Sequence, residues 1–422
     1  MEPPRKAAAL VLSTEEHGVS TGVYGRSQLR DFCVLGALLC AALLVLITRY
    51  SFLDLDRDFV YFYSEGKLLK EHPPEQLYDF RVQREVDNEV RSIGESGYGP
   101  SPYPPYVALF FRSFAALPFG AAYHLWMLVT FCLYVSGAWL LSRTFFPDRL
   151  DQAAWVCGSL LFWPFLGNTL LNGQLSAVGF FSIGSALCAQ HARRPYWSGL
   201  ALSLSLYKPT LLIWLIPLLL VGRAWRTLAS FFSVALVLFS ITTVTLGPQI
   251  WIGYAKMTAS LGEWQRYLHQ EDHVDILGMF ALATGRTPGV GGLICLFLGG
   301  LWIVFIWAYV LRHRAHNSLV VAWALTLPTA LLVNLYSPVY DSILLIPSLI
   351  VCARLIPGML GFWPLMGCLV ILATSYCSTW IAVLYHVQLI GISLIAVSAI
   401  QMWKLHQSWL EFDGERDVDG AA

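Results

Sequence analysis

The sequence predicts an all-α polytopic membrane protein with about twelve transmembrane helices. Of its 422 residues, 56% are hydrophobic and only 13% are charged, whereas about 25% of the residues in soluble domains are charged. The apolar residues also occur in long stretches, and a helix of about 20 apolar residues crosses the hydrocarbon core of a bilayer. Lysine plus arginine and aspartate plus glutamate both total 27, so the chain lacks the basic excess that favours nucleic-acid binding. These observations exclude a soluble globular protein.

All nine cysteines lie in apolar stretches, and no two of them form a Cys-x-x-Cys pair. This pattern argues against a zinc site, a redox motif and a disulfide framework. We expect the cysteines to be small buried hydrophobic residues.

The chain is predicted to have a single membrane domain between two polar ends. Residues 1–31 are polar and basic, and we expect them to form a disordered cytoplasmic N-terminus. This segment is too long for a removable signal peptide and lacks a small-residue cleavage site, so the first span, residues 32–48, should remain as an anchor. The membrane domain covers residues 32–405, and residues 406–422 form a polar cytoplasmic tail that we expect to be disordered.

Two long loops are predicted on the outer side of the membrane. The first, residues 49–119, contains two expected amphipathic surface helices, at residues 59–69 and 76–91. The second, residues 247–288, contains an amphipathic stretch from residue 251 to residue 270. The spans after the first are predicted at residues 120–142, 152–167, 174–190, 197–207, 209–221, 227–246, 289–311, 318–335, 342–356, 359–381 and 385–404.

Arginines set the predicted orientation of these spans. The short outer turns, residues 168–173, 336–341 and 382–384, contain no lysine or arginine. The inner connections are basic, as the positive-inside rule requires. Both termini are therefore expected in the cytoplasm. The inner arginines are Arg143, Arg149, Arg193, Arg194, Arg223, Arg226, Arg312, Arg314 and Arg354.

Residues 197–221 could be one long span or two half-spans broken at Lys208-Pro209. A single crossing would place Arg223 and Arg226 outside and invert every later loop. Proline also removes a backbone donor and breaks a helix. We therefore favour a broken hairpin with Lys208 at its outer apex, an arrangement tolerated where it lines a cavity within the protein.

Asp58 has two interpretations. It could act as a general base at the membrane surface, or it could cap the helix that begins at the next residue, and spacing alone favours the cap. Asp56 and Asp58 form an Asp-x-Asp pair that could hold a hard cation, but two carboxylates are a weak signature and we predict no metal ligand. His269 and His273 are four residues apart, but no matching carboxylate pattern makes them a metal site.

Other polar residues also fall on the outer side. A buried lysine needs a polar partner, so Lys208 is expected either to bind a lipid phosphate, to snorkel to the interface or to pair with Asp341. Asn172 and Gln174 offer amide donors, although a turn explains Asn172 by itself. The turn with Tyr340 and Asp341 could bind sugar hydroxyls, although tyrosines are also common at the membrane interface.

Several short motifs occur together in a recognisable order between about residue 32 and residue 347. They are Asp58-Phe59-Val60-Tyr61-Phe62-Tyr63, Leu77-Tyr78-Asp79, Tyr103-Pro104-Pro105-Tyr106, Asn172-Gly173-Gln174, Gly199 with Tyr207-Lys208-Pro209, and Ser337-Pro338 with Tyr340-Asp341. By these motifs the chain resembles glycosyltransferase family 87. This family is a branch of the GT-C superfamily of multi-span enzymes that use polyprenyl-phosphate sugars.

The resemblance implies an inverting hexosyltransferase, similar to α-1,2-mannosyltransferases, in a bacterial plasma membrane. It implies a polyprenyl-phosphate sugar as donor and a glycolipid or glycan as acceptor. We expect no cofactor, with a divalent cation as the alternative. Asp58 aligns with the family's catalytic aspartate, and Lys208 is our candidate for the cation that stabilises the leaving phosphate. The remaining predicted substrate-binding residues are Asn172, Gln174, Tyr103, Tyr340 and Asp341.

Two features limit the resemblance. Relatives often place a histidine in the Ser-Pro turn, whereas Val339 and Tyr340 follow Pro338 here. Broken spans with a polar apex also occur in transporters. A transporter or flippase for lipid-linked sugars is therefore the alternative function.

Overall fold

The computed structural model describes residues 30–31, 33–39, 41–42, 45, 58–91, 103–264, 270–312, 317–360 and 362–419. These residues form helices and no strand, apart from one isolated antiparallel bridge between His273 and Pro338. Asp54, Asp56 and His269 lie outside the described residues, as do nearly all of residues 1–31 and much of the first predicted span. The chain is an all-helical polytopic membrane protein.

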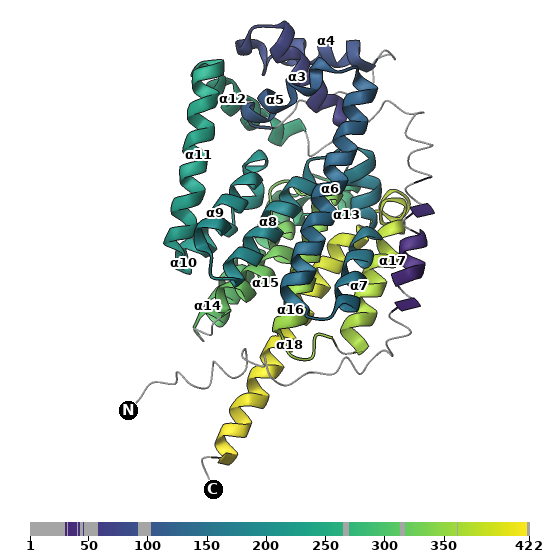
Figure 1. Ribbon diagram of the computed structural model, residues 1–422, viewed down its shortest axis with the longest axis vertical. Coiled ribbons are helices and arrows are strands. Elements are labelled where there is room, and N and C mark those ends of the chain that lie inside the picture. Colours follow the sequence, from purple (N-terminus) through teal and green to yellow (C-terminus); the bar gives the residue numbers. More distant parts are fainter. Residues whose placement is uncertain are drawn as a thin grey trace.

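Four short or amphipathic helices gather at one end of the bundle, at the top of Figure 1. They are α3 (Phe59–Glu71), α4 (Phe80–Arg91), α5 (Pro105–Phe111) and α12 (Gln249–Trp264). These helices belong to the two predicted outer loops. The last helix, α18 (Leu389–Asp419), extends from the opposite end.

Helix α3 differs from the surface helix that the sequence predicts, because nine of its 13 residues are buried. Its aromatic face packs on α5, with the rings of Phe62 and Phe111 stacked at 5.3 Å. Gly66 allows this approach, since a Cβ added there would lie 2.4 Å from the carbonyl oxygen of Phe111. Helix α4 has the expected amphipathic character, with Gln83 and Val86 buried while Arg84 and Glu85 are exposed.

The remaining helices form the membrane bundle (Figure 1). Helix α7 (Arg149–Leu160) continues into the π-helix η3 (Pro164–Leu171) with a bend of 59°. The other helices are α6 (Phe119–Phe145), α8 (Ser176–His191), α9 (Pro195–Ser203), α10 (Leu215–Val221), α11 (Trp225–Leu246), α13 (Ile276–Thr284), α14 (Gly289–Leu311), α15 (Ser318–Leu332), α16 (Leu345–Leu355), α17 (Phe362–Tyr385) and α18.

Within the described residues, four helices are long and apolar enough to cross a membrane: α6, α11, α14 and residues Leu389–Leu410 of α18. The bent pair of α7 and η3 adds a fifth. Each predicted span after the first overlaps one or more of the described helices, but the count of twelve spans stays a prediction.

The helical path breaks at Lys208, between the short 3₁₀ helices η4 (Leu204–Tyr207) and η5 (Pro209–Leu212). The start of α9 lies beside the start of α11, because Ser230 Oγ donates a hydrogen bond to the carbonyl oxygen of Tyr196 (2.8 Å). Two of the basic turns, with Arg193 and Arg223, therefore lie at the same end of the bundle. This is the hairpin geometry that the proline and the arginines predict.

The C-terminal tail differs from the expectation of disorder from residue 406, since α18 continues to Asp419. The turns that follow the predicted span, residues 385–404, pack on α14. Tyr309 of α14 forms a hydrogen bond of 2.7 Å with Nδ1 of His406, and its ring lies 4.6 Å from that of Trp409. Such tertiary contacts stabilise a helix whose own sequence is polar.

Candidate functional site

The candidate site lies where irregular helical segments meet. The end of η3, the hairpin apex at Lys208 and the 3₁₀ helix η7 (Val339–Leu344) lie close together, beside the start of α3 and of α8. Breaks in helices expose backbone polar groups, which are tolerated at membrane depth only where they are enclosed by protein or line a cavity. The same breaks direct polar side chains into the bundle.

Asp58 does not act as the helix cap that spacing alone favours. It occupies the N-cap position of α3, but its side chain accepts no capping hydrogen bond. Instead, Nε2 of Gln174 donates to Oδ2 of Asp58 at 2.5 Å. The backbone brings the two together, because the amide of Phe59 donates to the carbonyl oxygen of Asn172 (2.9 Å). The Asp58 carboxylate is therefore oriented by a partner 116 residues away.

Gln174 also connects Asp58 to a tyrosine. The hydroxyl of Tyr103 donates to Oε1 of Gln174 at 3.3 Å. The turn that carries Gln174 includes Gly173 with φ +68°, a left-handed conformation that glycine adopts without strain. A Cβ at Gly173 would lie 2.7 Å from Cβ of Phe59, so glycine also permits the approach of α3.

Lys208 forms an ion pair with Asp341. The residues are 6% and 0% exposed, so of the alternatives for Lys208 the structure shows the Asp341 pair and not snorkelling. Ser176 Oγ donates to the other carboxylate oxygen, Oδ1 of Asp341, at 3.0 Å. Nζ of Lys208 lies 5.1 Å from the ring centroids of both Tyr336 and Tyr340. Both charges are thus compensated without bulk water.

Buried tyrosines surround these charged groups. Burial raises the pKa of Tyr103, Tyr336 and Tyr340, and the negative charges of Asp58 and Asp341 raise each of these pKa values further. Both carboxylates therefore act on one tyrosine cluster. Because raised pKa values keep the phenols protonated at neutral pH, these hydroxyls are hydrogen-bond donors and not bases.

A segment of the second predicted outer loop closes one side of the cluster. Nδ1 of His273 lies 3.2 Å from Oδ2 of Asp275, and the same oxygen accepts the amide hydrogen of Ser337 at 3.0 Å. The amide of Val274 donates to the carbonyl oxygen of Ser337 (2.9 Å). The His273 ring contacts the ring of Tyr336 edge-on at 4.9 Å. A histidine thus lies against the Ser-Pro turn, although it comes from a distant segment.

With this geometry in view, the comparison with known families is decisive. The sequence model of glycosyltransferase family 87 matches residues 102–338, which are more than half of the chain. The chain belongs to glycosyltransferase family 87. No curated protein and no solved structure matches it. Family membership supports glycosyltransferase activity, which requires a sugar donor and an acceptor.

The structure brings together most of the residues that the sequence analysis selected for a family 87 site. Asp58, Gln174 and Tyr103 form one hydrogen-bonded group, and Lys208 and Asp341 form another. Tyr340 lies against the second group. Asp58, Tyr340 and Asp341 fall outside the matched range. Asn172 contributes its backbone carbonyl, and its side chain makes no hydrogen bond to a described residue.

Sequence reasoning missed four polar residues of this region: Ser176, Tyr207, His273 and Asp275. Tyr207 lies inside a motif of the resemblance, and its ring stacks on Tyr103 at 6.4 Å. Asp275 carried a usable signal, because an aspartate before an apolar helix is a typical N-cap and its Oδ1 does accept the amide of Gly278 (2.8 Å). For His273, the sequence offers only its spacing of four residues from His269, which does not predict a contact with the Ser-Pro turn.

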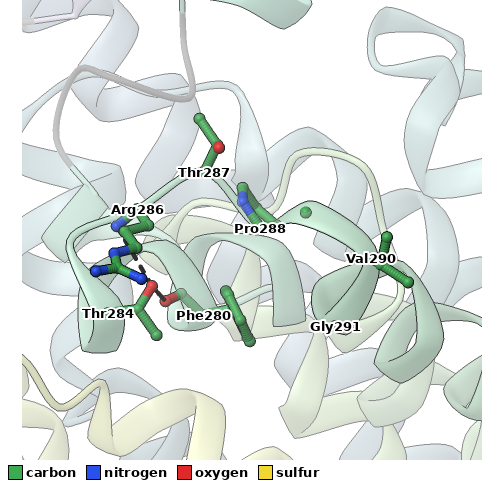
Figure 2. Close-up of a pocket in the computed structure, with 8 residues that line it drawn as sticks. Phe280, Thr284, Arg286, Thr287, Pro288, Val290 and Gly291 are labelled. Atoms are coloured by element: carbon green, nitrogen blue, oxygen red, sulfur yellow. Dashed lines mark hydrogen bonds between the residues drawn. The ribbon is translucent and has the colours of Figure 1, made fainter.

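Among the described residues, no group of three histidine, cysteine or acidic side chains is close enough to hold a metal ion. An open pocket lies elsewhere, at the turn between α13 and α14 (Figure 2). Of the described residues that line it, Arg286 alone is charged, and its side chain is exposed. Apart from Phe280, its lining residues lie at or beyond Thr284, which is about 14 Å along the helix from Asp275. It is separate from the tyrosine cluster.

Proposed function

We propose that this protein is an inverting hexosyltransferase that transfers a mannosyl unit from a polyprenyl-phosphate sugar to a glycolipid or glycan acceptor. The reaction takes place at the outer face of a bacterial plasma membrane, with both termini in the cytoplasm. One observation carries the proposal: the Asp58 carboxylate is oriented by Gln174 at 2.5 Å and shares a tyrosine cluster with the Lys208–Asp341 pair.

Asp58 is the proposed general base. In an inverting transfer, the acceptor oxygen attacks the anomeric carbon from the face opposite the phosphate, and the bond from that carbon to the phosphate oxygen breaks. The acceptor proton passes to the carboxylate, and the bonding electron pair leaves with the phosphate. A base must lie about 2.6–3.2 Å from the acceptor oxygen. The hydrogen bond from Gln174 fixes the orientation of one carboxylate oxygen for this task.

Lys208 is the proposed cation for the phosphate. Its ammonium has three donors, and the Asp341 carboxylate accepts only one of them in the ion pair. A donor fixed before the reaction stabilises charge as it develops on the leaving phosphate. The protonated phenols of Tyr103 and Tyr340 can donate hydrogen bonds to sugar hydroxyls or phosphate oxygens.

The lipid carrier fits this position. A polyprenyl chain is apolar and stays in the bilayer, so its sugar must be reached from within the membrane domain. The site is built at the breaks of η3 and the Lys208 hairpin, away from the basic turns that contain Arg193 and Arg223. A polar cluster enclosed by spans near the outer end meets this requirement.

The test is transfer by the purified full-length protein from radiolabelled polyprenyl-phosphomannose, with other sugars on the same carrier as alternatives, followed by lipid extraction. Asp58→Asn should lower the rate at least 100-fold, in the range of general-base contributions. Glu75→Gln, which removes an exposed charge of the same loop, should leave the rate unchanged. Full activity of Asp58→Asn would refute the assignment of the base. Movement of the donor across the membrane without a covalent product would favour a flippase.

A further inference from the structure

The second outer loop contributes a histidine–aspartate pair whose purpose the proposed reaction does not explain. His273 is 7% exposed and Asp275 is 1% exposed. Asp275 is fully engaged, because it accepts from Gly278, from Ser337 and from the His273 ring. It therefore fixes the position of the imidazole relative to the Ser-Pro turn.

The pairing defines the proton position on the ring. A carboxylate only accepts hydrogen bonds, so Nδ1 of His273 carries the hydrogen that points to Asp275. Nε2 then faces away from Asp275 across the ring, and it has no hydrogen-bond partner among the described residues. Nε2 keeps some solvent access although the residue is only 7% exposed, so a ligand can reach it. Such an atom beside a substrate site is a candidate ligand contact.

The imidazole lies near the proposed phosphate cation. The His273 ring is 4.9 Å from the centroid of Tyr336, and Nζ of Lys208 is 5.1 Å from the same centroid. The ring and the ammonium are therefore at most 10 Å apart. Lys208 is already compensated by Asp341, so a phosphate that gains negative charge benefits from a second donor.

We propose that Nε2 of His273 binds the phosphate of the lipid-linked donor and of the lipid phosphate product, with Asp275 as the positioning residue. As an imidazolium, the ring donates from both nitrogens, Nδ1 to Asp275 and Nε2 to a phosphate oxygen. This role rests on the proposed function, since it assigns the contact to the phosphate of that reaction. The same phosphate then lies between His273 and Lys208.

Binding of the product lipid tests this role without catalysis. The full-length protein in detergent is titrated with a polyprenyl monophosphate and, separately, with the polyprenyl alcohol of the same chain length. His273→Phe keeps a ring beside Tyr336 but has no nitrogen. It should bind the monophosphate about tenfold or more weakly than the wild type, as expected for a lost hydrogen bond to a charged group, and bind the alcohol equally well. His124→Phe, at an exposed histidine of α6, is the matched control.

Each outcome decides one question. Equal monophosphate binding by wild type and His273→Phe overturns the role of His273 and leaves the proposed function intact. A loss that is the same for the monophosphate and the alcohol also overturns it, because a purely structural defect has that pattern. If the wild type binds the monophosphate no more tightly than the alcohol, the proposed donor class fails. Should His273→Phe not fold, His273→Gln replaces it and must bind the monophosphate at least threefold more weakly.

Discussion

Replacing Lys208 by methionine tests the buried ion pair at the centre of the site. The side chains of Lys208 and Asp341 are 7% and 1% exposed. After the substitution, the Asp341 carboxylate stays buried with the Ser176 hydroxyl as its remaining described hydrogen-bond donor. Removing one partner of a buried pair costs about 3–5 kcal/mol of unfolding free energy.

Replacing Asp341 by asparagine should lower the free energy of unfolding by less than Lys208→Met does. In Asp341→Asn, the amide oxygen can still accept from Lys208 while the amide NH2 donates to the Ser176 hydroxyl oxygen, and the rings of Tyr336 and Tyr340 still face the ammonium. Each ring contributes about 0.5–2 kcal/mol to a cation. The double variant buries no unpaired charge, so it should be more stable than Lys208→Met alone by about 2–4 kcal/mol.

Thermal unfolding in detergent measures these differences. At roughly 1–2 °C per kcal/mol for a chain of this size, Lys208→Met should melt about 3–10 °C below the wild type. The double variant should recover part of that loss. The reasoning is wrong if Lys208→Met has the same melting temperature as the wild type. It is also wrong if the double variant, with Lys208→Met and Asp341→Asn, has a lower melting temperature than Lys208→Met alone.

Further predictions concern the base, the packing of α3, the phenols and metal ions. Gln174→Met should lower the transfer rate about tenfold at saturating donor and the melting temperature by only a few degrees, because it removes the hydrogen bond to Asp58 and the one from Tyr103. An unchanged rate would show that Gln174 does not orient the base. Gly66→Ala should melt several degrees lower, since its Cβ meets the Phe111 backbone at 2.4 Å, whereas Gly120→Ala, with nothing within 4 Å, should not. Because burial raises the pKa of Tyr336, raising the pH from about 7 to about 9 leaves this phenol protonated, so Tyr336→Phe and the wild type should show rate profiles of the same shape over that range. Chelation with EDTA should leave activity unchanged, and a loss restored by a divalent cation would contradict the prediction that no residue of the site binds a metal ion.

The sequence predicted the break and the family that define the candidate site. Lys208 before a proline predicts a break, and the arginine turns predict which end of the bundle that break faces. The order of the short motifs predicted glycosyltransferase family 87, and the match over residues 102–338 confirms it. These signals are local or compositional, so they can be recognised in the sequence without knowledge of the fold.

Other features depend on segments that are far apart in the chain. The spacing of an aspartate before a helix favours a cap over a base, and only the structure shows that the Asp58 side chain makes no capping hydrogen bond and accepts from Gln174 instead. The burial of α3 likewise depends on α5 and α6, because its own sequence is only weakly amphipathic.

The sequence by itself determined that this chain is a helical membrane protein of family 87, because composition, charge asymmetry and motif order do not depend on packing. Only the tertiary structure decided that Asp275 binds the amide of Ser337, 62 residues away, and that His273 therefore lies against Tyr336. The physical reason is that a side chain's partner is set by which helix ends meet, and long-range contacts of this kind leave no period or motif in the sequence.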